Sequence, residues 1–147
     1  MIKEYNNYII SDDRSRIDKE QVHTWLANTY WSPGVSHERV VKAMDNSTLV
    51  VGVYLNDTQV GYMRLVSDKT TFSWVSDVYV DQAHRGKGLA RAMVAFAMEH
   101  PEFAAINRWL LATRDAHDVY RPLGFGPLEY PDHFMWKGVQ IPMPQNE

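Results

Sequence analysis

The sequence predicts a mixed α/β domain, of the α+β kind, around a mostly antiparallel sheet. Three β-rich runs follow one another within residues 48–80, which favours antiparallel strands joined by short turns. Residues 18–30 and 89–100 carry apolar side chains at helical spacing instead. A chain of 147 residues with 45% hydrophobic and 22% charged residues forms about one domain with a sizeable core. We therefore expect residues 1–147 to be a single domain.

The N-terminal part predicts one strand and two helices. Residues 7–11 are a short β-rich run, and a helix is expected over 18–30. Asp18 is its expected N-cap, with Gln21 completing a capping box, and Ser36 caps a second, shorter helix. The first helix buries one apolar face, which consists of Val22, Trp25, Leu26 and Tyr30.

Three consecutive strands are expected next. They cover residues 48–55, 60–66 and 71–80, and the first two are joined by a hairpin turn at 56–59. Together they predict the antiparallel centre of the sheet.

The C-terminal part predicts a return to alternating elements. A crossover helix runs from Leu89 to the stop at His100-Pro101, and residues 108–113 form a buried strand. A short helix follows, capped at Asp115 and closed by Gly124. Residues 125–139 are expected to supply one or two further strands.

Composition excludes several classes of function. The 147 residues contain no cysteine, which excludes disulfides, thiolate catalysis and cysteine-based zinc sites and favours a reducing cytoplasm. The longest apolar run, residues 48–55, is far short of the ~20 needed to cross a bilayer, and residues 1–14 do not resemble a secretory signal. A net charge of −3 gives no reason to expect nucleic-acid binding. We expect no metal, membrane or nucleic-acid partner.

Positive charge is concentrated in residues 84–121, which carry six Arg or Lys against four acids, while the rest of the chain is acidic. This segment is suited to an anion, although ordinary scatter of solvated charges would give the same count. Within it, residues 78–90 read as a strand, a turn through Gly86 and Gly88, and a helix. Glycines permit positive φ, and the first helical amides with Arg85 and Lys87 beside them form a site for a phosphate or pyrophosphate. A purely structural turn is the alternative.

Comparison with known phosphate-binding motifs shows which of them the glycine turn resembles. The Walker pattern is absent, and the dinucleotide fingerprint fails because Arg91 stands where its third glycine belongs. Arg85-x-x-Gly88-x-Ala90 resembles instead the [Q/R]-x-x-G-x-[G/A] signature of the GCN5-related N-acetyltransferases (GNAT), which holds the pyrophosphate of acetyl-coenzyme A. Residues 116–125 are similar to a second element of that family, A-x-x-[F/L]-Y-x-x-x-G-F. The order and spacing of both elements also fit.

The resemblance implies a GNAT-like sheet with a splayed pair of strands, flanking helices and an acetyl-coenzyme A site. Backbone groups of the strand before the loop would pair with the pantetheine arm, and an amide there would face the thioester oxygen. Amides of the loop, with the Arg85 side chain, would take the pyrophosphate. The residues implied are Val78, Tyr79, Val80, Arg85, Gly86, Lys87, Gly88, Leu89 and Ala90.

Two catalytic residues are expected. By resemblance, Tyr120 protonates the departing thiolate, a role open to a phenol that is neutral at pH 7. A base is needed because an alkylammonium has a pKa near about 10.4. Asp77, a carboxylate within an apolar strand, is the first candidate, and its alternatives are local hydrogen bonding or attraction of a cationic substrate. His117 is a second candidate for the base, whereas His84 is expected to contact solvent or phosphate.

The acceptor side is expected to be an aromatic-walled pocket with charged groups, suited to a small-molecule amine or a peptide amine. Core packing is the alternative for most of these aromatic residues, above all Trp25 and Trp74. Thr113 stands where many relatives have Asn, and Pro122 is expected to tighten or end the short helix. The expected pocket residues are Tyr30, Trp31, Arg64, Asp68 and Phe72.

The expected function is acetyl transfer from acetyl-coenzyme A by direct attack of an amine. A non-catalytic acyl-coenzyme A sensor and a binder of another nucleotide are the alternatives. A homodimer is also left open, since His133–Val139 could pair across it.

Overall fold

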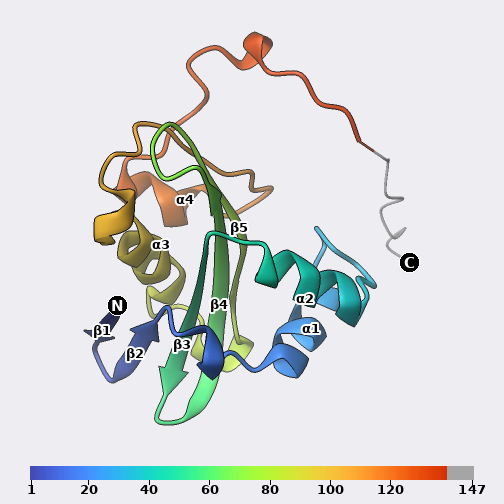
Figure 1. Cartoon of the computed structure of the whole chain (residues 1–147), viewed down its shortest axis with the longest axis vertical. Helices are drawn as coiled ribbons and strands as arrows, with labels where there is room; N and C mark the ends of the chain where they lie inside the picture. Colours follow the sequence, from blue (N-terminus) through green and yellow to red (C-terminus); the bar gives the residue numbers. More distant parts are fainter. Residues whose placement is uncertain (139–147) are drawn as a thin grey trace.

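The computed structural model describes residues 1–138, which form a six-stranded sheet with helices on both faces (Figure 1). The strands follow the order of the chain, β1-β2-β3-β4-β5-β6. Every neighbouring pair is antiparallel except β5 and β6, which are parallel. This is the expected α+β fold with an antiparallel start and one crossover.

The N-terminal hairpin and two helices come first. Strands β1 (Ile2–Tyr5) and β2 (Tyr8–Ser11) pair around a tight turn, so the single strand expected at 7–11 is the second half of a hairpin. Helix α1 covers Lys19–Ala27, and helix α2 covers His37–Asp45. Both expected N-caps are confirmed, since the side chain of Asp18 accepts from the Gln21 amide and that of Ser36 accepts from the Arg39 amide.

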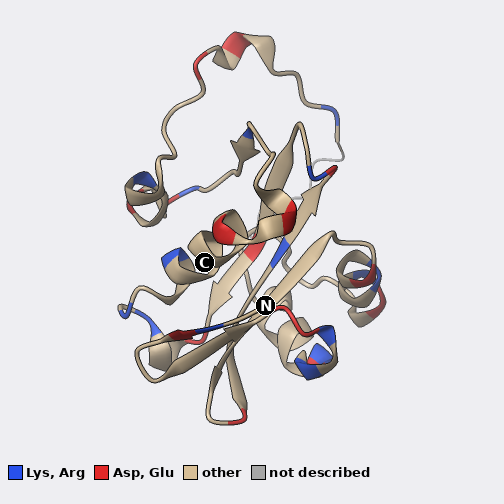
Figure 2. Ribbon diagram, turned by 60° about the vertical axis from the view of Figure 1, so that its left-hand side comes forward, with Lys and Arg blue, Asp and Glu red and all other residues tan. Residues whose placement is uncertain are grey.

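The central strands β3 (Leu49–Leu55), β4 (Thr58–Ser67) and β5 (Ser73–Val80) lie within two residues of their expected bounds. Strand β3 is almost wholly buried because both faces of the sheet are covered. Helices α1 and α2 cover one face, and helix α3 (Leu89–Glu99) covers the other. Most charged positions lie on the helices and loops around the sheet (Figure 2).

A β-bulge interrupts β5. Tyr62 pairs with Tyr79 and Arg64 with Ser76, so Asp77 and Val78 together oppose one residue of β4. The extra residue explains why Val75 and Val80, an odd number of positions apart, pack in the same core cluster with α3. Because of the bulge, the side chains of β5 after Asp77 point to the opposite face from the one that a regular strand would give them.

The C-terminal part departs most from expectation. Strand β6 is only Trp109–Leu110 and is half-buried, whereas a buried strand over 108–113 was expected. Helix α4 (His117–Tyr120) has Ala116 as N-cap, and the Thr113 hydroxyl accepts the Ala116 amide, so the expected cap at Asp115 is wrong. Pro122 lies in a 3₁₀ turn that continues α4 and ends at Gly124, as expected.

No strand follows within residues 125–138, so the expected strands there are wrong as far as the structure describes them; Val139 lies outside the described residues. This segment, termed the arm, leads away from the sheet and makes one 3₁₀ turn at Pro131–His133 (Figure 1). Without a neighbouring strand, a β-rich run has no partner for its backbone groups. Trp74 is also 37% exposed rather than part of the core, while Trp25 is buried.

Candidate active site

A cleft of about 910 Å³ opens where β5 and β6 separate. The two strands pair only at Ser73–Trp109 and Trp74–Leu110, so the last residues of β5 have no partner on the β6 side in the described structure. Four segments line the cleft: Asn28–Trp31, Val78–Val80, the loop and helix start within 82–91, and residues within 114–120. The splayed pair of strands expected from the sequence therefore forms this opening.

The glycine loop forms one end of the cleft. Gly86 and Gly88 have φ values of 76° and 79°, the left-handed region that side chains disfavour. Gly88 is the N-cap of α3 and supplies no side-chain cap, and the first backbone bond of the helix is made by the Ala92 amide. The amides of the first turn are thus available to an anion at the cleft, which Leu89, Ala90 and Arg91 line.

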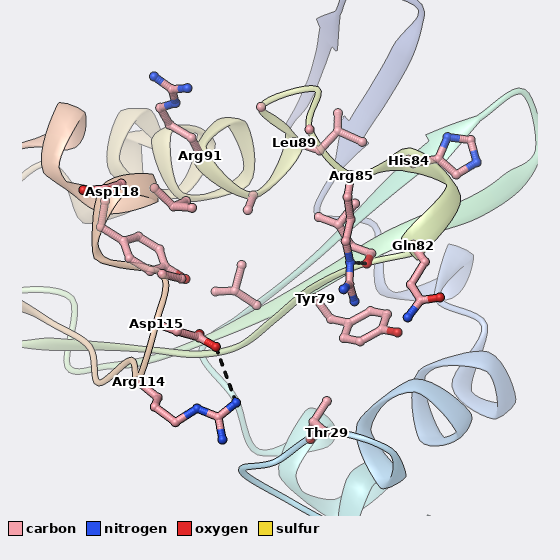
Figure 3. A pocket seen from close by; sticks show the side chains of 18 of the residues that line it. Thr29, Tyr79, Gln82, His84, Arg85, Leu89, Arg91, Arg114, Asp115 and Asp118 are labelled. Carbon is pink, nitrogen blue, oxygen red and sulfur yellow. Dashed lines mark hydrogen bonds and ion pairs between the residues drawn. The ribbon is translucent and has the colours of Figure 1, made fainter.

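Arg85 is held above the end of β5. Its Nε donates to the Val80 carbonyl at 2.9 Å, and its guanidinium lies 5.3 Å from the centre of the Tyr79 ring. Tyr79 in turn stacks on Trp25 of α1 at 5.2 Å. Figure 3 shows Arg85 reaching down to Tyr79 at one side of the cleft, while Arg91 projects from the helix away from Arg85. Arg85 adds positive charge to the end of the cleft that the free helical amides and Arg91 also line.

Tyr120 lies at the other wall, where α4 faces the end of β5. Its ring is 8% exposed and packs edge-on against Phe125 at 6.0 Å. Burial, together with the electrostatic effect of Tyr30, raises the pKa of Tyr120 to about 12. The phenol therefore keeps its proton across the whole neutral range and can act as a proton donor within the cleft.

The loop between α1 and α2 closes the mouth of the cleft. The Tyr30 hydroxyl accepts a hydrogen bond from the Arg114 amide at 3.0 Å, which ties this loop to the segment before α4. Figure 3 shows Arg114 and Asp115 on this side, paired with each other at 3.4 Å. The mouth is thus lined by aromatic and charged groups.

Eleven of the residues expected at the site line this cleft together: Tyr30, Trp31, Val78, Tyr79, Val80, Arg85, Gly86, Gly88, Leu89, Ala90 and Tyr120. Lys87 does not line it: its carbonyl accepts from Tyr5, and its ammonium lies 3.4 Å from the Tyr8 hydroxyl. His84 lines the cleft and bonds the Tyr8 hydroxyl through Nδ1 at 2.9 Å, whereas His117 is not among the lining residues.

The remaining expected residues lie outside the cleft. Asp68 closes its own turn, and hydrogen bonds from the Thr71 hydroxyl and from the Thr70, Thr71 and Phe72 amides hold its pKa well below the usual range. Phe72 belongs to the same turn. Arg64 and Asp77 form an ion pair of 2.6 Å beneath the α1–α2 loop, so the local pairing kept as one alternative for Asp77 is present.

Several lining residues were not expected, including Asn28, Thr29, Gln82, Arg91, Arg114, Asp115 and Asp118. Arg91 could have been found, since it lies one helical turn after the glycine loop. Asn28 and Thr29 only mark the end of a helix in the sequence, and no local pattern brings them to the cleft.

Within residues 1–138, the structure contains neither a membrane-spanning helix nor a cluster of metal ligands. No helix there is both long and apolar enough to cross a membrane. No group of three His, Asp or Glu side chains there could hold a metal ion.

The comparisons agree on one family. Residues 15–125 match the sequence model of the acetyltransferase (GNAT) family. A Gibberella zeae protein described as an acetyltransferase is 24% identical, over 93% of this chain and 88% of its own length. A ycf52-like N-acetyltransferase of Prochlorococcus marinus is 30% identical over 71% of this chain and 59% of its own length.

Solved structures show the same relationship. A Xanthomonas campestris pv. campestris structure described as a GNAT-family acetyltransferase is 34% identical, with a TM-score of 0.87 over 92% of this chain and 96% of its own. A Staphylococcus aureus protein, 21% identical, shares the fold with a TM-score of 0.70 over 97% of this chain and 99% of its own. With a family match over most of its length and the cleft described above, this chain belongs to the GNAT family of acetyltransferases.

Proposed function

We propose that the protein is an acetyl-coenzyme A-dependent N-acetyltransferase that acetylates a primary amine of a small molecule or peptide. One observation carries the proposal: the buried phenol of Tyr120 lines the same cleft as the uncapped start of α3. The helix start would then bind the pyrophosphate of a co-substrate, and Tyr120 would lie near its thioester. Family membership supports acetyl-coenzyme A as that co-substrate.

The residues present fit this group. Gly88 has a φ of 79°, which favours glycine, and an alanine Cβ there would lie 2.6 Å from the Tyr5 hydroxyl, which would have to move. The first-turn amides of α3, with Arg85 and Arg91, would hold the pyrophosphate. Backbone groups of Val78 and Tyr79 would bind the pantetheine arm, whereas the Val80 carbonyl already accepts from Arg85.

The thioester supplies the acetyl group and a thiolate leaving group. An amide at the end of β5 would stabilise the charge that develops on the thioester oxygen. Tyr120 would give its proton to the thiolate, which a phenol with a raised pKa can do because it stays protonated at neutral pH. The proton that the attacking amine loses would restore the phenol. Tyr30 and Trp31 would bind the acceptor. Asp77 was expected to act as the base, but its pairing with Arg64 does not favour that role.

Calorimetry and an acceptor screen together test the proposal. Coenzyme A should bind, and ATP should bind much more weakly, because the cleft has the splayed strand for pantetheine as well as the phosphate loop. A panel of small amines and peptides should then release free thiol from acetyl-coenzyme A. Binding without turnover on any amine would favour the non-catalytic sensor, and equal binding of ATP would favour another nucleotide.

A homodimer also stays a proposal, as does a cytoplasmic location. The arm supports the dimer, because Met135 and Trp136 are 98% and 75% exposed and a second copy would cover them. Light scattering should give twice the monomer mass for the full chain and the monomer mass for a double variant, Met135→Ser with Trp136→Ser. A monomeric wild type would contradict it.

A further inference from the structure

Asp77 links the sheet to the loop that closes the cleft. One carboxylate oxygen, Oδ2, accepts from Arg64 Nε at 2.6 Å, and the other, Oδ1, accepts from the indole Nε1–H of Trp31 at 3.0 Å. Arg64 also reaches the Ser47 hydroxyl at 3.4 Å. Both oxygens of the carboxylate are therefore engaged, one by a strand and one by a loop.

The bulge in β5 makes this geometry available. Asp77 has a φ of 54°, a conformation that costs a side-chain-bearing residue energy and that Asp and Asn tolerate best. The carboxylate is only 13% exposed, so its charge needs a partner, which Arg64 provides. The paired carboxylate in turn gives the Trp31 indole an acceptor.

The loop is tied on its other side as well. Tyr30 packs edge-on against Trp31 at 5.0 Å, and its hydroxyl accepts from the Arg114 amide. Consecutive residues of one loop are thus tied to two different segments beside the cleft, to β5 through Asp77 and to the segment before α4 through Arg114. Both Tyr30 and Trp31 line the cleft.

We propose that Asp77 is a positioning residue: it fixes the indole of Trp31, and with it the α1–α2 loop, as the wall against which the acceptor amine binds. The inference rests on the proposed acetyl transfer. A general base must lie within hydrogen-bond reach of the proton that it removes. Asp77 instead uses both oxygens within the fold and does not line the cleft, while the indole that it holds does.

Three variants test the link with an acceptor from the screen. Trp31→Phe removes the indole N–H and keeps an aromatic ring. Asp77→Asn keeps a residue that tolerates a positive φ, and with its amide oxygen on the Arg64 guanidinium it sets the NH₂ against the indole N–H of Trp31. Each should raise KM for the amine about tenfold, the effect expected for losing a hydrogen bond to a charged group, and leave kcat and KM for acetyl-coenzyme A nearly unchanged. Trp74→Phe, an exposed tryptophan on the same strand, is the control and should change neither KM.

The double variant should be no worse than either single one, because both break the same link. A kcat reduced a hundredfold or more by Asp77→Asn, with an acidic inflection lost from the pH profile, would instead make Asp77 the base. Additive effects, or a fall in melting temperature with KM unchanged, would also overturn the inference.

A readout without turnover separates this inference from the proposed function. In ¹⁵N-labelled protein the indole N–H signal of Trp31, assigned by its absence in Trp31→Phe, should exchange slowly with solvent. Asp77→Asn should shift that signal and speed its exchange, while the other indole signals stay in place. An unchanged signal would overturn the link whether or not an acceptor is known, whereas absent coenzyme A binding would overturn only the proposed function.

Discussion

Arg114 covers Tyr30 at the mouth of the cleft. Its guanidinium lies 3.9 Å over the centre of the Tyr30 ring, and its backbone amide donates to the Tyr30 hydroxyl at 3.0 Å. The two residues are 84 positions apart in the chain, and their contact joins the α1–α2 loop to the segment that leads into α4. Tyr30 and Arg114 both line the cleft that Tyr120 also lines.

Tyr30→Phe should loosen the mouth of the cleft. The variant keeps the ring under the guanidinium but removes the acceptor of the Arg114 amide, so that amide should exchange faster with solvent. Hydrogen exchange at the Arg114 amide measures this directly. Tyr130→Phe, on the exposed arm, is the matched control and should leave the exchange rate unchanged. Equal rates in wild type and Tyr30→Phe would show that the hydrogen bond does not hold the loop.

Tyr120→Phe should separate catalysis from binding. Loss of a general acid lowers kcat by about a hundredfold to ten-thousandfold, while the affinity for coenzyme A should hold because the phosphate loop is untouched. Steady-state kinetics and calorimetry on the same preparations check both parts. A variant that keeps more than a third of the wild-type kcat would rule out Tyr120 as the acid.

The pH dependence of turnover should rise and then stay high. The protonated phenol is the active form of Tyr120, and because its pKa is raised to about 12, that form persists to about pH 11. The amine must be neutral to attack, so kcat/KM should increase with pH towards the pKa of the amine itself. A profile from pH 6 to 10 measures this, and a falling limb centred near pH 8 would contradict the assignment of Tyr120.

The two loop glycines should differ in their response to alanine. Gly86→Ala places its Cβ in open space and should cost only the left-handed conformation, roughly 1 kcal/mol of the free energy of unfolding. Gly88→Ala carries the same conformational cost, and its Cβ also displaces the Tyr5 hydroxyl from the Lys87 carbonyl. Denaturant unfolding should therefore rank Gly88→Ala as the less stable variant. Equal stability would mean that Tyr5 moves aside at no cost.

Asp12 should stabilise the fold at neutral pH. Burial alone would raise its pKa, but hydrogen bonds from the N-terminal amine at 2.6 Å and from His100 at 2.9 Å outweigh it and lower the pKa. A carboxyl with a lowered pKa stabilises the folded state above its unfolded pKa and loses that effect as pH falls through the folded value. Asp12→Asn should thus lower the free energy of unfolding at pH 7 by on the order of 1 kcal/mol.

The deficit of Asp12→Asn should shrink below about pH 4. Thermal unfolding at pH 7 and pH 3 measures the change, with Asp132→Asn on the arm as a control. A deficit of the same size at both pH values would assign the effect to something other than the charge of Asp12.

Sequence patterns predicted correctly the features that depend on residues a few positions apart, such as helix caps and tight turns. Asp18 and Ser36 cap their helices because a short side chain reaches an amide three residues ahead whatever lies around it. Gly86 and Gly88 form a turn before α3 for the same kind of reason. The end of the short helix at Pro122 likewise follows from a missing amide.

The sequence alone did not predict the contacts between segments that lie far apart in the chain. Asp68 and Arg64 carry charges suited to a pocket, but one closes its own turn and the other pairs with Asp77. The sequence contains nothing that locates the bulge at Asp77, because it depends on how β5 is registered against β4. Arg114 lines the cleft beside Tyr30, which lies 84 positions earlier in the chain.

The sequence by itself therefore determined the family, the α+β fold, the glycine loop before α3 and the tyrosine of the cleft, because each depends on residues close together in the chain. Only the tertiary structure decided what Asp77, Arg64 and Trp31 do, and that the arm forms no strand within the described residues. Strand pairing and charge pairing need partners from elsewhere in the chain, and the choice among those partners is made by the packed sheet.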